Sequence, residues 1–420
     1  MTAPVVYDIS RLLLRSFAPG PNGIDRIDLN LARHFLSAPA NRGIILNKLR
    51  PVAVRDAGAL VDRVAAAWNE DRDPADDPVY LELRDRLISG TSRTVPHERG
   101  RRALSRGHAG MVLEVLRQLH KCGLTIPRHA TFIHATQFPS SAMFRWLDGR
   151  PDVASVFFVH DLLPLRHPEW FTERNAEEHR KFLDVLVRYA RAAIVNTRIV
   201  RDELRALFKA RGARQIPILA EAMPAAPVFA AAEPADAELR AVPYFVICGT
   251  IEPRKNHRLL LTLWERLAQS EGPQAPKLVI AGRRGWNNAD VFAQLDSLSP
   301  HSAIIEASGL STAGLARIMA NACALLMPSL AEGYGLPIIE ALAAGTPVIA
   351  SDIPVFREVG GERVTYCDPR DPESWRKAIT AHVPPRDPGA TGQGMQNDAA
   401  WTRYYGRLEA FVADPAAVSP

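Results

Sequence analysis

Apolar runs alternate with amphipathic stretches along the second half of the chain. The runs, typical of strands buried on both faces, occupy residues 244–250, 277–282, 302–308, 323–329 and 347–352. From Asn256 onward, helical spacing is carried by Leu259, Leu260, Leu263, Trp264 and Leu267. Strands alternating with helices predict βαβ units and a parallel sheet. Such a sheet binds ligands beyond the carboxyl ends of its strands.

The first half repeats this pattern less regularly. Apolar runs predict strands at 5–10, 131–136, 154–161 and 192–197. A helix beginning near Asn22 would bury the stripe formed by Ile24, Ile27, Leu31 and Phe35. Residues 51–127 look like an elaboration of this half, with a helix near 108–121.

These patterns predict an α/β protein of two Rossmann-like, doubly wound domains that face a central cleft. The first domain would span 1–235 and the second 241–395, with an Ala-, Pro- and Asp-rich linker at 230–243. A last amphipathic helix is expected at 398–414, and the first domain is one surface on which it would pack.

Composition narrows the class of protein. The chain has 420 residues, 47% hydrophobic and 23% charged, which is typical of a globular protein with two domains. No signal sequence or apolar span of about 20 residues is evident, and the cysteines Cys122, Cys248, Cys323 and Cys367 lack metal-ligand spacing. We therefore expect a cytoplasmic protein with reduced cysteines. A net charge of +5 fits an anionic partner, but no nucleic-acid signature accompanies it.

The segment EGYGLPIIE carries two acids, Glu332 and Glu340, across a strand-to-helix loop. Gly333 and Gly335 allow a ligand to approach the backbone, and Pro337 suits the first turn of a helix. The helix N-terminus then offers N–H groups to anions or hydroxyls, while the carboxylates accept hydrogen bonds from hydroxyls. Alone, two glutamates at this spacing indicate no more than a capped helix; in this context they predict a ligand site.

A second strand-end loop holds Arg254 and Lys255 before a helix that we expect Asn256 to cap. Cations at a helix N-terminus oppose the helix dipole unless a negative ligand lies there. The pair therefore favours a diphosphate, with a solvated basic loop as the alternative. Taken individually, the loops after 282 and 308 are best interpreted as ordinary strand-to-helix loops. The alternative is that they border a nucleotide base, where Gly309 and Leu310 would offer backbone contacts.

Together, GTIEPRKN and PSLAEGYGLPIIEALAAGTPVIASD resemble the GT-B glycosyltransferases, specifically the large retaining family 4. The resemblance is strongest over 244–360 and weaker across the first half. It implies that Glu332 binds hydroxyls of the donor sugar and Glu340 the ribose. It also implies that Arg254 and Lys255 neutralise the leaving diphosphate. Backbone N–H groups around Tyr334, Gly335 and Leu336 would hold the sugar.

The resemblance extends to two places in the first half. PGPNGIDRIDLNLA is similar to the glycine-rich loop and first helix of the family, which approach the diphosphate, here with Gly23. His160 in FFVHDLLP matches a strand-end histidine near the transferred sugar. From the residue alone, a structural histidine is the better interpretation; the resemblance favours a functional one.

The implied reaction is transfer of a hexose, mannose favoured, from a GDP- or UDP-sugar to a hydroxyl of a glycan or lipid-linked acceptor, with retained configuration. The pathway would be bacterial surface polysaccharide biosynthesis. The family needs no divalent metal and no cofactor, and Asp71 and Asp73 are interpreted as a solvated surface run. The alternatives are another GT-B enzyme of epimerase or phosphorylase type, and a catalytically inactive scaffold protein.

The acceptor is expected in the first domain. Residues 93–108 carry five arginines, which suit either contact with anionic lipid at the inner face of the cytoplasmic membrane or a flexible basic loop.

Overall fold

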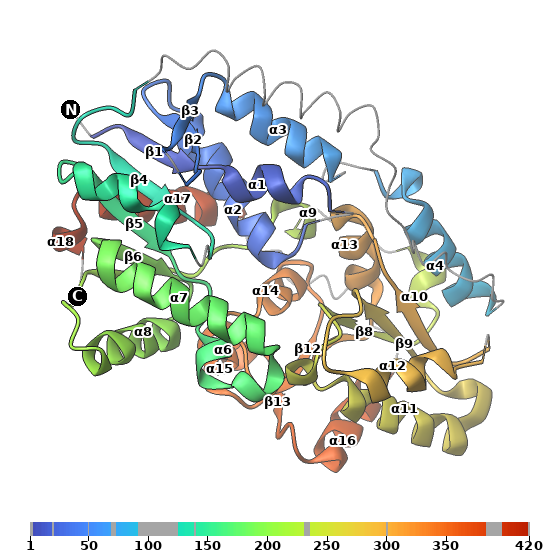
Figure 1. Cartoon of the computed structure of the whole chain (residues 1–420). Helices are drawn as coiled ribbons and strands as arrows, with labels where there is room; N and C mark the ends of the chain where they lie inside the picture. The colour runs from blue at the N-terminus through green and yellow to red at the C-terminus, as the bar shows by residue number, and fades with distance from the viewer. Residues whose placement is uncertain are drawn as a thin grey trace.

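The computed structural model describes residues 3–18, 21–48, 50–68, 73–90, 125–137, 140–230, 236–299, 301–383 and 397–418. Within these ranges the chain forms two α/β units, the first at the upper left and the second at the lower right in the view of Figure 1. The expected helix near 108–121 and the arginines of 93–108 lie outside them.

The first unit is built on a sheet whose described strands have the order β3-β2-β1-β4-β5-β6-β7. All neighbours are parallel except β2 and β3. The strands are β1 (Val5–Asp8), β2 (Arg42–Ile45), β3 (Val52–Val54), β4 (Thr131–His134), β5 (Ala154–Phe158), β6 (Ala192–Val195) and β7 (Ile218–Ala220). Strands 5–10, 131–136, 154–161 and 192–197 were thus predicted, whereas β2, β3 and β7 were not.

Helices cover both faces of the first sheet (Figure 1). On one face lie α1 (Ser10–Arg15), α2 (Gly23–Leu36) and α3 (Ala57–Ala67). On the other lie α7 (Glu173–Tyr189) and α8 (Arg198–Ala210), while the short α6 (Leu163–Arg166) precedes α7. Alternate residues of β1 enter different cores, Tyr7 on the α2 side and Val6 on the α7 side. Burial on both faces explains why these strands read as continuous apolar runs.

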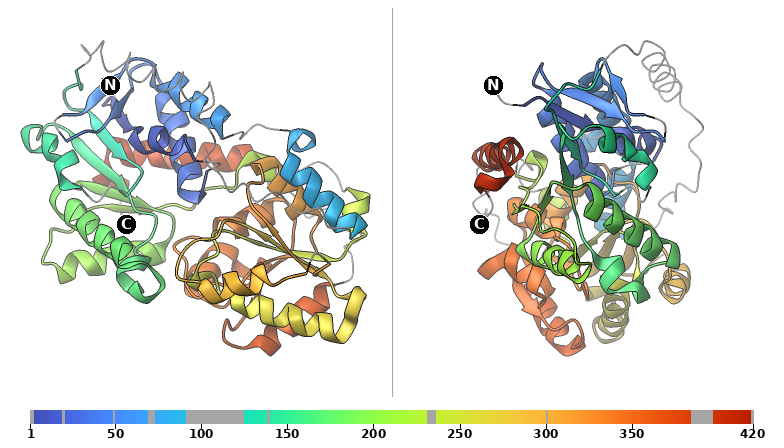
Figure 2. Two further views of the ribbon diagram at one scale, coloured as in Figure 1. Left: turned by 45° about the vertical axis from the view of Figure 1, so that its right-hand side comes forward. Right: turned by 60° about the vertical axis from the view of Figure 1, so that its left-hand side comes forward.

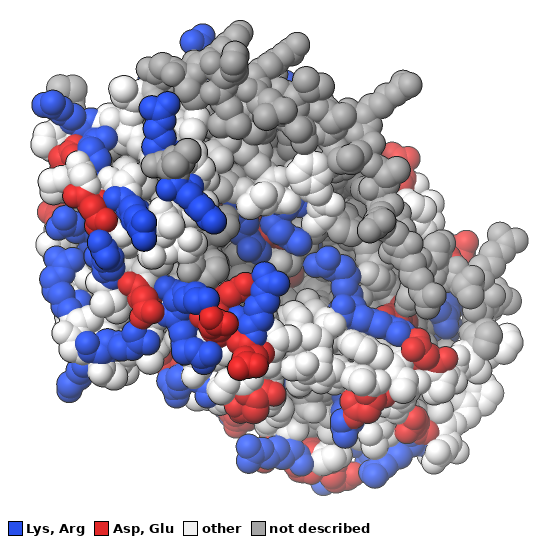
Figure 3. Space-filling model, in the orientation of Figure 1, with Lys and Arg blue, Asp and Glu red and all other residues white. Residues whose placement is uncertain are grey.

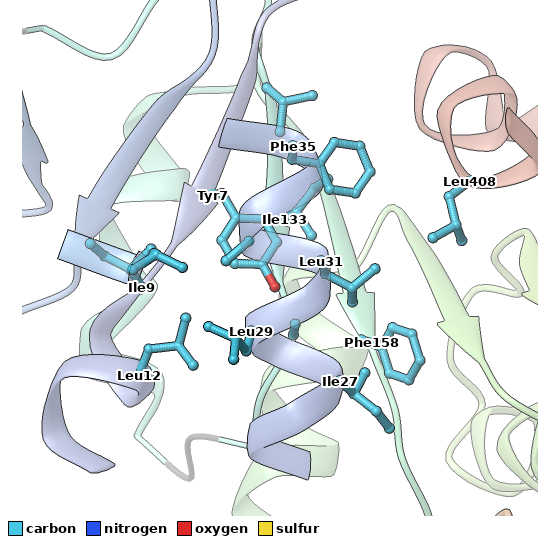
Figure 4. Packing of buried hydrophobic residues seen from close by; sticks show 14 of the residues in the cluster. Tyr7, Ile9, Leu12, Ile27, Leu29, Leu31, Phe35, Ile133, Phe158 and Leu408 are labelled. Atoms are coloured by element: carbon cyan, nitrogen blue, oxygen red, sulfur yellow. The ribbon is translucent and has the colours of Figure 1, made fainter. Parts of the chain in front are cut away.

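Helix α2 packs much as its apolar spacing predicts. Ile27, Leu31 and Phe35 are buried against β1, β4 and β5, and Figure 4 shows them beside Tyr7 and Ile133. Ile24, expected in the same stripe, is only partly buried. The Asn22 side chain accepts a hydrogen bond from the Asp25 backbone N–H, and the Asp25 carboxylate accepts one from Asn22, which forms a capping box.

The second unit carries an all-parallel sheet with the described order β10-β9-β8-β11-β12-β13. Its strands are β8 (Tyr244–Cys248), β9 (Lys277–Ala281), β10 (Ile304–Ala307), β11 (Ala324–Met327), β12 (Val348–Ser351) and β13 (Thr365–Cys367). This is the doubly wound order, with its switch point between β8 and β11. The last strand, β13, was not expected from the sequence.

The helices of the second unit divide between its two cores. One face carries α9 (Pro227–Ala230), α10 (Ala237–Arg240), α13 (Thr312–Asn321), α14 (Leu336–Ala343) and α15 (Pro354–Gly360). The other face carries α11 (His257–Glu271), α12 (Ala289–Asp296) and α16 (Pro372–His382). Asn256 precedes α11 as expected, but in a left-handed conformation without a side-chain cap, because its amide donates to the Pro369 carbonyl.

Two helices cross between the units. Helix α4 (Pro78–Ser89) lies inside the range 1–235 but packs Tyr80, Leu83 and Leu87 into the core of the second sheet. Helix α17 (Asn397–Ala413), followed by α18 (Pro415–Val418), returns to the first unit, where Leu408 lies across from α2 (Figures 2 and 4). The domain boundaries 1–235 and 241–395 stay predictions, and α4 does not follow them in space.

Candidate active site

The candidate site lies at the switch point of the second sheet. Strand β8 ends at Cys248, and Gly249 adopts a left-handed φ of +125° that few other residues tolerate. A Cβ at Gly249 would lie 3.3 Å from the Lys255 Nζ atom, so the turn folds over that ammonium group. Arg254 and Lys255 occupy a short 3₁₀ turn, η5 (Pro253–Lys255), directly before α11.

Arg254 and Lys255 both contact Glu332 from the loop after β11. The Arg254 guanidinium lies 2.5 Å from Glu332 Oε2, and Lys255 Nζ lies 2.5 Å from Glu332 Oε1. The Ser329 hydroxyl also donates to Glu332, at 3.0 Å. A second carboxylate, Glu252, lies 2.7 Å from Arg254. Thus residues predicted separately as an anion site and a sugar site are bound to each other.

Burial and pairing set the charges of this cluster. Burial alone would raise the pKa of the Glu332 carboxyl, but the adjacent Arg254 and Lys255 outweigh it and lower the pKa to about 2. Glu332 is therefore ionised at neutral pH. Burial also raises the pKa of Glu252, an effect that Arg254 offsets only in part. Arg254 itself has its pKa raised by Glu332 and Glu252 against the opposing effect of burial.

The loop that carries Glu332 leads into α14. Gly335 is the N-cap residue, with a φ of +94°, and no side chain caps the helix. The start of α14 therefore offers N–H groups and a partial positive charge to an anion or hydroxyl. Across the cleft lies Gly23 at the start of α2, where an added Cβ would lie 3.9 Å from Leu336. Two helix N-termini, one from each unit, thus face the same space.

Glu340 lies on the first turns of α14, and its side chain is 2% exposed. It forms an ion pair with Arg26 of α2, with 3.1 Å between Arg26 NH1 and Glu340 Oε1. The same guanidinium donates to the Thr312 hydroxyl at 3.3 Å. Glu340 faces the cleft as expected, and in this conformation it is held by a residue of the opposite unit.

Tyr334 and Gly333 press against the first unit. The Tyr334 side chain is buried in the α2–α17 core, and its hydroxyl donates to the Met223 carbonyl. A Cβ at Gly333 would lie 2.6 Å from the His160 carbonyl oxygen, closer than real Cβ contacts allow. The Thr197 hydroxyl donates to the Gly333 carbonyl at 3.1 Å. The backbone of this loop, rather than the Tyr334 ring, is therefore what borders the cleft.

His160 follows β5 and is 5% exposed. Its Nε2 lies 2.8 Å from the Ala135 carbonyl and must donate there, because a carbonyl oxygen only accepts. Its Nδ1 has no hydrogen-bond partner within the described part of the chain. Burial lowers the pKa of His160 to about 4, so the ring is neutral at pH 7. One ring nitrogen is thus structural, and the other is a buried acceptor without a partner among the described residues, so the functional role of His160 stays a prediction.

Gly309 and Leu310 follow β10, two strands from the switch point. Gly309 has a φ of +92°, and nothing in the described structure lies within 4 Å of where its Cβ would stand. Leu310 is half-buried and packs against the core beneath α13. An open backbone at the end of β10 leaves room for a ligand, and the base-binding role stays a prediction.

Sequence reasoning missed several residues of the cleft, above all Arg26 and Glu252. Arg26 lies in the segment NGIDRIDLN, where an arginine one turn into a helix with an otherwise apolar face was a usable signal. Glu252 directly precedes the predicted cation pair. Arg26 acquires its partner only through the fold, since Arg26 and Glu340 are 314 residues apart, whereas Glu252 pairs with Arg254 on the same loop.

The described residues bear on metal binding and on membrane spans as follows. Among the described residues, no three His, Cys, Asp or Glu side chains gather as ligands for a metal ion. Asp73 instead caps η1 (Pro74–Asp76) by accepting from Ala75 N–H, while Asp71 lies outside the described residues. Within the described ranges, every helix is too short or too polar to span a bilayer.

Two Rossmann-like units whose strand ends meet at a shared cleft define the GT-B class. Over residues 235–383, the chain matches the model of the family described as "Glycosyl transferases group 1". The serotype-specific mannosyltransferase WbdA of Escherichia coli is 32% identical over 242 residues, which are 54% of this chain and 29% of WbdA. The O-antigen chain mannosyltransferase RfbU of Salmonella typhimurium is 52% identical over 62 residues, 15% of this chain and 18% of RfbU.

Solved structures agree on the fold. HepE of Anabaena in complex with UDP is 16% identical and gives a TM-score of 0.55, with 99% of each chain covered. Sucrose-phosphate synthase of Thermosynechococcus elongatus is also 16% identical, with a TM-score of 0.55 over 98% of this chain and 96% of that one. The chain therefore has the GT-B fold, and its residues 235–383 match the glycosyl transferases group 1 family. It spans well under two thirds of the length of the relatives WbdA and RfbU.

Proposed function

We propose that this protein is a retaining, metal-independent mannosyltransferase. It would transfer mannose from a nucleotide-diphosphate sugar to a hydroxyl of a glycan in surface polysaccharide biosynthesis. The observation that carries the proposal is the buried cluster of Arg254, Lys255 and Glu332 at the switch point of the nucleotide-binding sheet. The mannosyltransferase names of the relatives WbdA and RfbU support the sugar and the pathway.

The cluster suits the chemistry of a diphosphate leaving group. In the reaction the bond between the sugar C1 and the diphosphate oxygen breaks, and negative charge grows on that oxygen. Arg254 and Lys255 are fixed in advance by Glu332, so they stabilise this charge without reorganising. The N-termini of α14 and α2 add N–H groups on both sides of the same space.

Glu332 is suited to bind the donor sugar rather than to attack it. Its pKa of about 2 makes it a weak base, and both its oxygens are held by cations. Its carboxylate oxygens have further lone pairs that accept hydrogen bonds from sugar hydroxyls while the cations stay in place. Retention then follows from attack on the face that the leaving group departs from. The acceptor hydroxyl passes its proton to the diphosphate oxygen as the new C1–O bond forms.

A panel of nucleotide sugars tests this proposal. The protein is incubated with GDP-mannose, GDP-fucose, UDP-glucose and UDP-galactose, with and without EDTA, and released nucleotide and glycan product are measured. Turnover of GDP-mannose with EDTA present and a product of unchanged anomeric configuration by NMR is the expected result. Glu332→Gln should abolish that turnover. Release from none of the donors, with no thermal stabilisation by GDP or UDP, would favour a scaffold protein instead.

We propose further that a lipid-linked acceptor brings the protein to an anionic membrane surface through residues 93–108. The arginines in this segment are Arg93, Arg99, Arg101, Arg102 and Arg106. Each basic residue near an anionic leaflet contributes about 1 kcal/mol to binding. Co-sedimentation with vesicles containing phosphatidylglycerol tests this, and binding that survives replacement of all five arginines by alanine would refute it.

A further inference from the structure

Two arginines of the first unit share one buried carboxylate at the edge of the cleft. Arg11 Nε and Arg15 Nε lie 3.1 Å from the two oxygens of Asp25, whose side chain is fully buried. Asp25 also accepts the Asn22 backbone N–H at the start of α2, at 3.0 Å. Its capacity as an acceptor is therefore largely used. The Arg15 NH2 atom is buried and has no hydrogen-bond partner in the described structure.

A third arginine reaches this place from the second unit. Arg283 lies on the loop after β9, one strand away from the β8–β11 switch point. Arg283 is exposed, and its side chain forms no ion pair in the described structure. Its pKa is nevertheless lowered, by partial enclosure and then by the Arg15 guanidinium, with Asp25 opposing. Its backbone carbonyl accepts the Ile251 N–H at 2.8 Å, so Arg283 lies beside the loop that carries Arg254 and Lys255.

The balance of charge distinguishes this arginine cluster from the neighbouring cluster of Arg254, Lys255 and Glu332. There, the cations Arg254 and Lys255 are matched by Glu332 and Glu252. Here, Arg11 and Arg15 share Asp25 as their one directly contacting carboxylate, and Arg283 adds a third guanidinium group whose charge acts on Arg15. This cluster therefore carries a surplus of positive charge, and Figure 3 shows Lys and Arg side chains among those on the left and in the middle of this face, interspersed with Asp and Glu.

We infer that Arg11, Arg15 and Arg283 form an anion subsite that binds a phosphate group between the two units. Guanidinium groups present planar pairs of N–H donors that match phosphate oxygens, and the unpartnered Arg15 NH2 is one such donor. Because Arg11 and Arg15 belong to the first unit and Arg283 to the second, a phosphate bound here holds the cleft closed. Its charge also replaces the repulsion between Arg15 and Arg283 with attraction.

The phosphate group could belong to either of two substrates. This assignment to a substrate rests on the proposed function. One source is the diphosphate of the donor, which Arg254 and Lys255 would bind from the other side. The other is a phosphate carried by the acceptor, since Arg11 also lies near enough to His160 for its charge to act on that ring. The two sources share one chemistry and differ in whether a nucleoside diphosphate already occupies the cleft.

Isothermal titration calorimetry on the full chain distinguishes the donor diphosphate from an acceptor phosphate as the bound group. In the first arm, inorganic pyrophosphate, GDP and UDP are each titrated into the empty protein. In the second, inorganic phosphate is titrated into protein saturated with GDP or UDP. The first variant, Arg15→Gln, removes the guanidinium group that pairs with Asp25. The second, Arg283→Gln, removes a charge without breaking an ion pair. Arg376→Gln, an exposed arginine on α16, is the matched control.

We expect Arg283→Gln and Arg15→Gln to weaken binding about 10-fold in one arm, as the loss of one charge-assisted hydrogen bond predicts, and Arg376→Gln to leave it unchanged. A loss in the first arm assigns the subsite to the donor diphosphate, and a loss in the second arm to an acceptor phosphate. Equal binding by Arg283→Gln and the wild-type protein in both arms, or no binding of any probe, would overturn the subsite. If pyrophosphate binds through these arginines but no nucleoside diphosphate binds, the subsite stands and the proposed function fails.

Discussion

Lys255 is a nearly buried ammonium group between Gly249 and Glu332, at the place where a leaving diphosphate would develop charge. Lys255→Gln keeps the length of the side chain and removes its charge. We expect kcat/KM for sugar transfer to fall about 10²-fold or more, the usual effect of losing one preorganised stabilising group. Steady-state kinetics against Lys209→Gln, an exposed lysine on α8, checks this. Wild-type turnover in Lys255→Gln would remove the lysine from the mechanism.

His160 should make the stability of the protein fall in mild acid. Its folded-state pKa of about 4 lies below the ordinary value of 6.5, so the unfolded chain takes up the proton first as the pH drops. Between pH 7.5 and pH 5 this costs the folded state about 2 kcal/mol. His160→Gln lacks this loss, so the stability advantage of the wild-type protein over the variant should shrink by that amount. Urea unfolding at both pH values measures it.

The control for His160 is His301→Gln, which changes an exposed histidine. Its difference from the wild-type protein should stay constant over the same pH range. A His160→Gln difference that also stays constant would mean that the ring opens to solvent and is not held neutral by burial.

At the residue scale, local sequence singled out Glu332, Arg254 and Lys255 as candidates because each lies between a recognisable strand and a helix, and Glu340 because it lies near the start of the helix that follows. Their roles stay predictions. Local sequence was not enough to find their partners. The pairing of Glu332 with Lys255, or of Glu340 with Arg26, depends on how two loops or two domains meet, and no local pattern encodes that distance. The charge state of His160 depends likewise on burial by residues distant in sequence.

At the element scale, the loop before α14 depends on Gly333, because the opposite unit leaves no room for a side chain there. Gly333 needs no left-handed conformation, yet an added Cβ would lie 2.5 Å from Asp161 Cβ and 2.6 Å from the His160 carbonyl. Gly333→Ala should therefore cost about 1–3 kcal/mol of stability, as overpacking does, and reduce transfer by pushing the loop from the cleft. Thermal unfolding and turnover are compared with Gly149→Ala, where nothing lies within 4 Å. Equal behaviour of the two variants would contradict close contact of the units.

Strands could be predicted where the apolar pattern was long, and they were missed where it was short. The central strands are long apolar runs, whereas β3, β7 and β13 are three residues each and give too little pattern. Helix α4 was assigned to the first unit by its position in the chain. Its apolar side chains Tyr80, Leu83 and Leu87 cover the second sheet, and the Asp77 carboxylate at its start accepts the Ser311 N–H at 2.8 Å.

At the scale of the whole molecule, the two units contact each other at several places around the cleft. The Trp286 indole N–H donates to the Trp170 carbonyl at 3.1 Å, and Glu358 accepts the Arg198 backbone N–H at 2.7 Å. The Arg26–Glu340 ion pair is a third contact that joins the units. Helices α4 and α17 also cross from one unit to the other, so opening of the cleft must bend the chain near these crossings rather than separate independent domains.

The Arg26–Glu340 pair should act as a latch that nucleotide binding has to release. Glu340 is the carboxylate expected to accept ribose hydroxyls, and Arg26 holds it in the present conformation. Arg26→Ala removes the latch but leaves Glu340 in place. We expect a larger radius of gyration by small-angle X-ray scattering without ligand, and binding of GDP or UDP about 5-fold tighter, since no ion pair of about 1 kcal/mol has to be broken. Arg33→Ala, on the same helix and paired with Asp62, is the control and should change neither value. An unchanged radius of gyration with weaker nucleotide binding would mean that Arg26 is part of the binding site and not a latch.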